Sequence, residues 1–127
     1  MASTPDPERL YTVEEANAVL DEIRERLVRL RDARRIIVDS GERIREHATH
    51  NGGGVDGAAH WESLRVMREE LEWFAGQGII LRDTESGLLD FPAEREGRIV
   101  QLCWRLGEDR VAHWHEVDAG FPNRKPL

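Results

Sequence analysis

The sequence predicts an α+β protein, in which a long antiparallel helical hairpin with coiled-coil-like packing precedes a C-terminal antiparallel β-meander of three or four strands. Three observations predict this class. Apolar residues recur at alternating steps of four and three from residue 16 to residue 48, which is the repeat of a helical packing seam. A glycine-rich stretch at 49–57 separates this seam from a second one at 61–74. Short apolar runs between turn residues follow at 78–117, as expected for consecutive strands.

We divide the chain of 127 residues into a flexible leader at 1–10 and a single domain at 11–127. The leader, MASTPDPERL, contains two prolines and no hydrophobic repeat. The remaining length is sufficient for one hydrophobic core. Within the domain, the helical hairpin is predicted over 12–76 and the β-meander with its tail over 79–127.

The first helix is predicted to begin after Thr12, because Thr12 and Glu15 have the spacing of a capping box. Two residues, Arg34 and Gly41, interrupt its apolar seam. A glycine weakens a helix by about 1 kcal/mol relative to alanine, so we expect a bend near Gly41. The seam comprises Ala16, Leu20, Ile23, Leu27, Leu30, Arg34, Ile37, Gly41, Ile44 and Ala48.

The second helix is predicted from Ala58 to Ala75, and Trp61 and Phe74 on its seam are expected in the core. Helices of about 36 and about 18 residues span roughly 54 and 27 Å at 1.5 Å per residue, so the first helix extends beyond the second. Its N-terminal half, with Leu20, Ile23 and Leu27, must then be covered by the C-terminal segment or by a second subunit. We favour self-association as a homodimer, with the helical hairpin acting as an interaction module.

The C-terminal segment contains four candidate strands, GIILRD, GLLDFP, RIVQLCWRL and RVAHWHEV. A two- or four-residue turn between the last two would mix polar and apolar side chains on each face of the sheet. A three-residue turn at Glu108–Arg110 would instead sort polar and apolar side chains onto opposite faces, so we predict this turn. The tryptophan-rich face would then pack against the helices. This register pairs Trp104 with Trp114, Arg105 with His113, and Cys103 with His115.

The other face would collect the residues with the most chemical potential, namely Gln101, Cys103, Arg105, His113 and His115. Thiolate and imidazole are ligands for transition metals, so Cys103, His115 and His113 are candidate ligands and zinc or iron is the expected cofactor. Two alternatives stay open. Cys103 can be an inert buried residue, or a nucleophile with His115 as its base. The sequence identifies neither an orienting third group nor an oxyanion hole, and it therefore predicts no reaction.

Composition excludes several classes of partner. The net charge is -7 and the basic residues are interleaved with acids, which disfavours binding to nucleic acid or to an anionic membrane. Cys103 is the single cysteine, so no intrachain disulfide can form. No stretch approaches the roughly 20 apolar residues of a membrane span. We expect a cytoplasmic protein.

The segments YTVEEANAVLDEIRERL at 11–27 and GIILRDTESGLLDFP at 78–92, followed by CWR, GE, WH and GF motifs, resemble the prokaryotic domain-of-unknown-function 2203 family. The resemblance runs from Tyr11 over nearly the whole chain. It implies a small bacterial or archaeal protein, commonly a stand-alone domain, and no established activity. The family pattern has an aromatic residue at position 113, which leaves Cys103 with His115 as the better pair. The motif residues that it implies are Asp90, Cys103, Arg105, Glu108, His115 and Arg124.

The alternative function is that of a protein that binds a metal or a small anionic ligand in a pocket at the C-terminal sheet. An enzyme is one version of this alternative. Guanidinium groups suit carboxylate or phosphate, so Arg105 and Arg124 would hold the anion. Asp90 and Glu108 complete the set of candidate ligand-binding residues.

Overall fold

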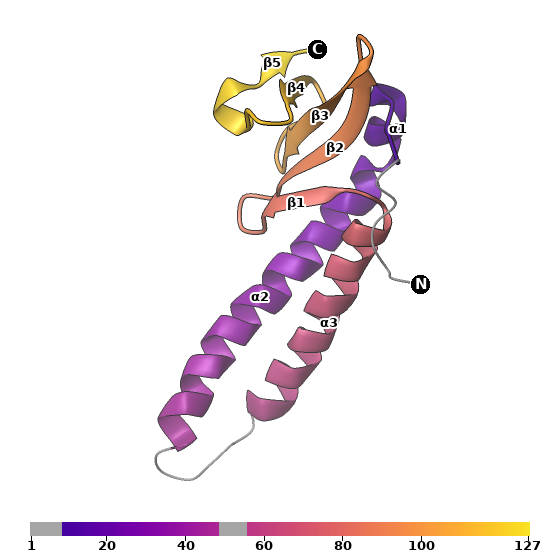
Figure 1. Cartoon of the computed structure of the whole chain (residues 1–127). Coiled ribbons are helices and arrows are strands. Elements are labelled where there is room, and N and C mark those ends of the chain that lie inside the picture. The colour runs from indigo at the N-terminus through magenta and orange to yellow at the C-terminus, as the bar shows by residue number, and fades with distance from the viewer. Residues whose placement is uncertain (1–8, 49–55) are drawn as a thin grey trace, which may run out of the picture. The chain divides into compact units, whose positions relative to one another are not determined.

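The computed structural model describes residues 9–48 and 56–127, and it is α+β as predicted (Figure 1). Two compact units contain, respectively, the chain up to Glu25 with Trp73–Leu127, and Arg26–Glu72. The predicted leader, apart from residues 9 and 10, and the glycine-rich stretch at 49–55 lie outside the described residues. The elements are α1 (Val13–Ala18), α2 (Leu20–Ala48), α3 (Asp56–Gly76), β1 (Ile80–Asp83), β2 (Leu88–Arg95), β3 (Arg98–Arg105), β4 (His113–Glu116), the 3-10 helix η1 (Phe121–Asn123) and β5 (Lys125–Pro126). None of the described helices is long and apolar enough to cross a membrane.

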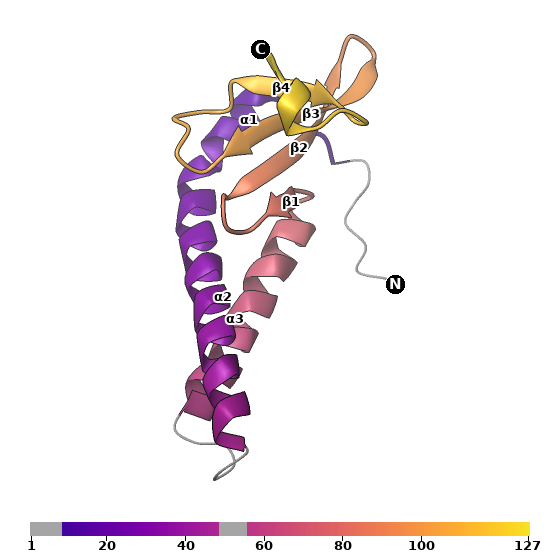
Figure 2. The same ribbon diagram turned by 90° about the vertical axis from the view of Figure 1, so that its left-hand side faces the viewer.

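The Arg26–Glu72 unit is an antiparallel pair of helices formed by parts of α2 and α3 (Figure 2). The buried carboxylate of Glu70 on α3 accepts hydrogen bonds from Arg26 at 2.7 Å and pairs with Arg29 at 2.8 Å. Farther along, the Ser40 hydroxyl lies 3.0 Å from Nδ1 of His60. Polar groups thus join the two helices at both ends of the unit.

The buried stripe of α2 differs from the predicted seam by one residue in two places. Ala33 and Ser40 are buried, whereas Arg34 is exposed and Gly41 is only half-buried. The observed stripe places small side chains between the helices and leaves the Arg34 guanidinium in water, where a charge is least costly. α2 continues as one helix through Gly41, so the helix is not broken there.

On α3, the prediction for Phe74 is confirmed and that for Trp61 is wrong. Phe74 is 1% exposed, but Trp61 is 69% exposed. The buried stripe of α3 includes Ser63 and the charged Glu70, whereas the neighbouring Leu71 is 39% exposed. Two arginines neutralise Glu70, which is the condition under which a carboxylate can be buried.

The other unit begins with a helix that the sequence predicts only in part. Thr12 Oγ1 accepts from the Glu15 N–H at 3.0 Å, and Glu15 Oε1 accepts from the Thr12 N–H at 2.8 Å, which confirms the capping box. However, α1 ends after six residues, and α2 begins only beyond Val19. The continuous first helix that the seam predicts is therefore broken near its start.

The sheet is an antiparallel meander with the strand order β1-β2-β3-β4-β5. The described residues form five strands, one more than the upper limit of the prediction. The additional strand arises because Lys125 and Pro126 of the tail pair with Trp114 and His113 of β4. The tail thus folds back beside the sheet through η1 and β5 (Figure 1).

The predicted pairing between β3 and β4 is wrong by two residues. Cys103 lies opposite His113, and Gln101 lies opposite His115. A shift of two preserves the alternation of side chains, so the two faces are composed as predicted. Trp104 and Trp114 still share the apolar face, where both are buried.

The register differs because the connection is longer than three residues and spans 106–112. Its backbone is bound by groups outside the ladder. The Val111 N–H donates to Oδ1 of Asn17 on α1 at 2.7 Å, and Arg24 on α2 donates to the Asp109 carbonyl at 2.8 Å. Trp104 Nε1 donates to the Glu108 carbonyl at 3.1 Å. These bonds hold the connection away from the β3–β4 ladder.

The apolar face of the sheet packs against the N-terminal part of the same unit. The Tyr11 ring lies edge-on to Phe91 with centroids 5.1 Å apart, and the Tyr11 N–H donates to the Pro92 carbonyl at 2.7 Å. Leu20, Ile23 and Leu27, for which a second subunit was one expected cover, are buried within the single chain. Burial of these three residues therefore needs no partner.

We predict that Asn17→Ala lowers the free energy of unfolding by about 1 to 3 kcal/mol, because it leaves the Val111 N–H without its acceptor. Urea unfolding would measure the change. Asn123→Ala at an exposed position is the matched control and should change stability by less than about 0.5 kcal/mol. Equal effects of the two substitutions would contradict the role given to Asn17.

Candidate metal centre

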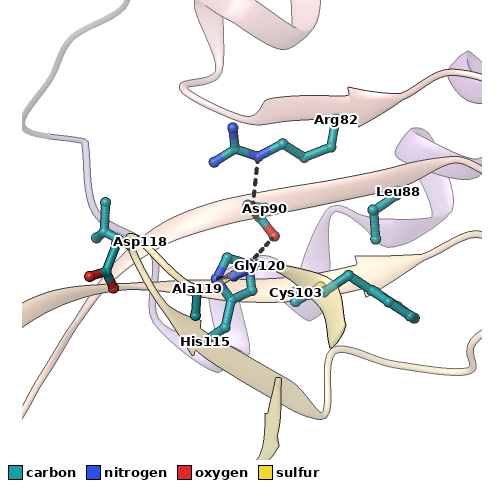
Figure 3. A pocket seen from close by; sticks show the side chains of 10 residues that line it. Arg82, Leu88, Asp90, Cys103, His115, Asp118, Ala119 and Gly120 are labelled. Atoms are coloured by element: carbon teal, nitrogen blue, oxygen red, sulfur yellow. Dashed lines mark hydrogen bonds and ion pairs between the residues drawn. The ribbon is translucent and has the colours of Figure 1, made fainter. Parts of the chain in front are cut away.

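Three consecutive strands bring one metal-ligating side chain each to the polar face of the sheet (Figure 3). Asp90 on β2 lies directly opposite Cys103 on β3, and His115 comes from β4. All three side chains are buried. One oxygen of Asp90, the sulfur of Cys103 and one ring nitrogen of His115 all lie within 4.8 Å of one another.

These separations are close to those of a tetrahedral zinc site. Bonds of about 2.0 Å to oxygen or nitrogen and about 2.3 Å to sulfur place ligand atoms roughly 3.2 to 3.7 Å apart. Asp90 Oδ1 and His115 Nε2 are 3.0 Å apart, so this pair already has almost the required spacing. The bound of 4.8 Å on the separations of the three ligand atoms exceeds the ideal separation in a zinc site by about 1 Å. A small side-chain rotation can close this difference.

Arg82 on β1 orients the Asp90 carboxylate. Its Nε donates to Asp90 Oδ2 at 2.9 Å, while Asp90 Oδ1 faces His115 (Figure 3). One oxygen is thus held by a guanidinium, and the other is directed into the cluster. This division is the one that a ligating carboxylate with an outer hydrogen-bond partner requires.

The ring of His115 is held at its other nitrogen. Nδ1 lies 2.7 Å from the Glu116 carbonyl oxygen and 3.2 Å from the Gly120 backbone nitrogen. A carbonyl oxygen only accepts and a backbone N–H only donates, so the two contacts require different tautomers of a neutral ring. The 3.0 Å contact between Nε2 and Asp90 Oδ1 needs a hydrogen between the two atoms when no metal is bound. A metal would take the place of that hydrogen, and donation from Nδ1 to the Glu116 carbonyl would then leave the lone pair of Nε2 for the metal.

The environment of Cys103 disfavours its thiolate form. Burial and the Asp90 charge raise the pKa of Cys103 to about 11, although Arg124, whose Nη1 lies 4.0 Å from the sulfur, acts in the opposite direction. A cysteine nucleophile needs a depressed pKa, so the nucleophile hypothesis is disfavoured. A bound cation would reverse this balance by displacing the proton.

Glu108 holds Arg124 beside the cysteine. Arg124 forms a two-pronged ion pair with Glu108, with Nη1 at 3.1 Å from Oε1, and Glu108 Oε1 also accepts from the Arg105 N–H at 2.8 Å. Burial raises the pKa of Glu108, but the bonds from Arg124 and from the backbone outweigh it and lower that pKa overall. Glu108 and Arg124, both candidate ligand-binding residues, therefore bind each other.

Arg105 takes a different position. Its guanidinium stacks over the Phe121 ring at 5.0 Å from the centroid, and Arg124 stacks on the same ring at 4.3 Å. Within the described part of the chain, the Arg105 side chain has no carboxylate at ion-pair distance. Among the candidate ligand-binding residues, Arg105 therefore carries an exposed positive charge that no carboxylate of the described residues balances.

A cavity of about 280 Å³ adjoins the three ligand atoms. The remaining lining residues are Arg82, Leu88 and residues 117–121, which include the acidic Asp118. Nearby, Gln101 is buried opposite His115, and its Oε1 has no hydrogen-bond partner among the described residues. A buried acceptor without a donor is rare and favours an additional polar group, such as water, at this face.

The structure therefore brings together only part of the residue set predicted from sequence. Cys103 and His115 meet as expected, and Asp90 joins them, whereas His113 lies outside the group and lines a separate hollow beside Val111 and Pro126. Arg82 was missed. The alternation of the β1–β2 hairpin, in which Ile80 opposes Asp90, is the signal that could have placed Arg82 on the same face.

Comparison with known proteins gives one match. The family model described as "Uncharacterized conserved protein (DUF2203)" covers residues 9–127 and confirms the resemblance drawn from the motifs. No curated protein and no solved structure matches the chain. The family description assigns no activity, so a function must be argued from the cluster itself.

We predict that Cys103 in the folded, metal-free protein reacts with iodoacetamide at pH 8 about 10²-fold more slowly than a free thiol, because a pKa of about 11 leaves little thiolate. Mass spectrometry of quenched samples would follow the reaction, and its rate should rise with pH. The same protein in concentrated urea is the control and should react at the free-thiol rate. Fast labelling of the folded protein would contradict the protected thiol.

Proposed function

This chain belongs to the DUF2203 family, and we propose that it binds one divalent transition-metal ion through Asp90, Cys103 and His115. The observation that carries the proposal is the convergence of three different ligand atoms at a buried point of the sheet. Zinc suits a mixed set of carboxylate, thiolate and imidazole best, and iron is the second candidate.

The surroundings of the three side chains support this assignment, since each has its own partner outside the cluster. Asp90 accepts from Arg82, His115 can donate to the Glu116 carbonyl, and Cys103 lies beside Arg124. Outer partners of this kind orient metal ligands and raise affinity.

Three protein ligands and an adjoining cavity are the arrangement of zinc sites that carry out chemistry. Structural zinc sites use four protein ligands, whereas catalytic sites leave the fourth position open. A metal bound at this position would supply a Lewis acid or an activated water next to the cavity. The residues around it would hold the ligands in place.

We expect the metal-free protein to bind one equivalent of Co²⁺, used as a coloured substitute for Zn²⁺, with a near-ultraviolet thiolate-to-metal absorption band. Cys103→Ala should abolish the band, and Asp90→Asn and His115→Ala should weaken Co²⁺ binding by more than about 10²-fold, since they remove ligands rather than outer partners. Competition with Zn²⁺ would give its affinity.

His113→Ala is the matched control, because His113 lies on the same strand and face but outside the cluster. It should bind Co²⁺ as the unsubstituted protein does. Circular dichroism would establish that each variant is folded. A folded, reduced protein that gives no thiolate band at excess Co²⁺ would refute the proposal.

We propose, as a second function, that the Arg26–Glu72 unit mediates formation of a homodimer. The supporting observation is the exposure of large apolar residues in this unit, foremost Trp61 at 69%, with Val28, Ile36, Val38 and Leu71 also exposed. Tryptophan is the residue type most enriched among energetically dominant interface positions. An acidic chain with such residues fits an interaction module.

Light scattering during size exclusion should then show a dimer, and Trp61→Ser should raise its dissociation constant at least about tenfold, as loss of an interface tryptophan typically does. Ile99→Ser removes an exposed apolar side chain from β3 instead and should leave the dimer intact. A monomer at every concentration tested would exclude this function.

A further inference from the structure

The cavity beside the cluster has features that select a ligand. It borders Asp90, Cys103 and His115 directly, and the tail residues Asp118, Ala119 and Gly120 also line it (Figure 3). A metal held by the three ligand side chains would lie next to this space and would have a coordination position left for another ligand. A ligand in the cavity could therefore reach the metal with one of its atoms.

Charge is the first selective feature. The Asp90 carboxylate and the Cys103 thiolate would together neutralise the charge of a divalent ion. The charge of Arg124 is already neutralised by Glu108. Arg82 and Arg105 remain as cations at the cavity and its rim, against one further carboxylate in the lining, Asp118, although the chain as a whole is acidic. The loaded site would consequently carry positive charge and favour an anion.

The geometry of Arg82 is the second feature. Only its Nε is used by Asp90, and its side chain is 45% exposed. Figure 3 shows the two terminal nitrogens directed away from the Asp90 carboxylate, and in the described residues neither has a hydrogen-bond partner. These nitrogens are donors without an acceptor among the described residues, on a side chain that lines the cavity.

The apolar part of the lining is the third feature. Leu88, Val117 and Phe121 contribute hydrocarbon surface to a volume of about 280 Å³. Such a volume lies at the lower end for small-molecule sites, which suits a ligand with only a few carbon atoms. An inorganic anion would leave this surface uncovered.

From these features we infer that the site binds a small organic carboxylate, with one carboxylate oxygen on the metal, the other on the terminal nitrogens of Arg82, and the hydrocarbon part against Leu88, Val117 and Phe121. The inference rests on the proposed metal site. Arg82 thereby has two roles, because it holds the ligating Asp90 through Nε and the exogenous carboxylate through its remaining donors. A planar guanidinium is suited to this double use.

The test uses the full-length protein loaded with Co²⁺, whose visible absorption reports changes at the open position. Acetate, butyrate and benzoate are titrated as probes, with acetamide as the neutral analogue and inorganic phosphate as the competing oxyanion. We expect each carboxylate to shift the visible bands, and butyrate or benzoate to bind at least about fivefold more tightly than acetate, since each buried methylene contributes roughly 0.8 kcal/mol. Acetamide should cause no shift.

Variants separate the roles of the arginines. Arg82→Gln should weaken benzoate binding at least about tenfold while the thiolate band shows that Co²⁺ is still bound, because it removes a charge-assisted bond. Arg105→Gln should weaken it only at low ionic strength, since Arg105 attracts the anion without contacting it. Arg95→Gln removes a cation that stacks on Trp114 on the opposite face and should have no effect.

The outcomes are distinguishable from those of the metal proposal. Absence of the thiolate band would contradict both the metal proposal and the present inference. A protein with the band but no response to any carboxylate overturns the present inference alone, and so does a response to phosphate that exceeds the response to all three carboxylates. Unchanged benzoate affinity in folded, Co²⁺-loaded Arg82→Gln would remove Arg82 from the site.

Discussion

The burial of one carboxylate governs the polar half of this protein. Asp90 lies in the middle of β2 with 2% of its surface exposed, where an isolated charge would cost several kcal/mol. Its two oxygens are directed to groups from different strands, Arg82 on β1 and His115 on β4. Both partners must remain close to Asp90, so the positions of β1, β4 and the tail that contacts His115 are all coupled to this carboxylate.

Strand alternation explains how one short sheet serves two purposes. The same β3 that contributes Val100, Leu102 and Trp104 to the apolar core presents Gln101 and Cys103 to the opposite face. A meander of adjacent strands brings like positions into rows across the sheet. The core therefore holds the polar cluster rigidly, and the tail at 117–124 closes over that cluster from outside the ladder.

Local sequence patterns predicted the fold class, the capping box at Thr12 and the composition of the two faces, because each depends on neighbouring residues alone. The register of β4 depends on Asn17 and Arg24, which bind the 106–112 connection from far away in the sequence. Similarly, burial of Glu70 depends on two arginines of another helix, and it displaces the apolar seam that would have buried Trp61. The placement of Cys103 and His115 on one face was predictable from strand alternation, although their direct cross-strand pairing was predicted wrongly. The contribution of Asp90 to the same point required the β2–β3 register.

All three side chains of the cluster come from residues 90–115, on strands that are neighbours in both sequence and space. Forming such a unit closes only short loops, and short loops cost little chain entropy. The meander can accordingly assemble its polar cluster early in folding, before the long helices find their final contacts. A cation captured at that stage would act as a nucleus for the sheet, so supply of metal during synthesis would affect the yield of folded chains as well as the occupancy of finished ones.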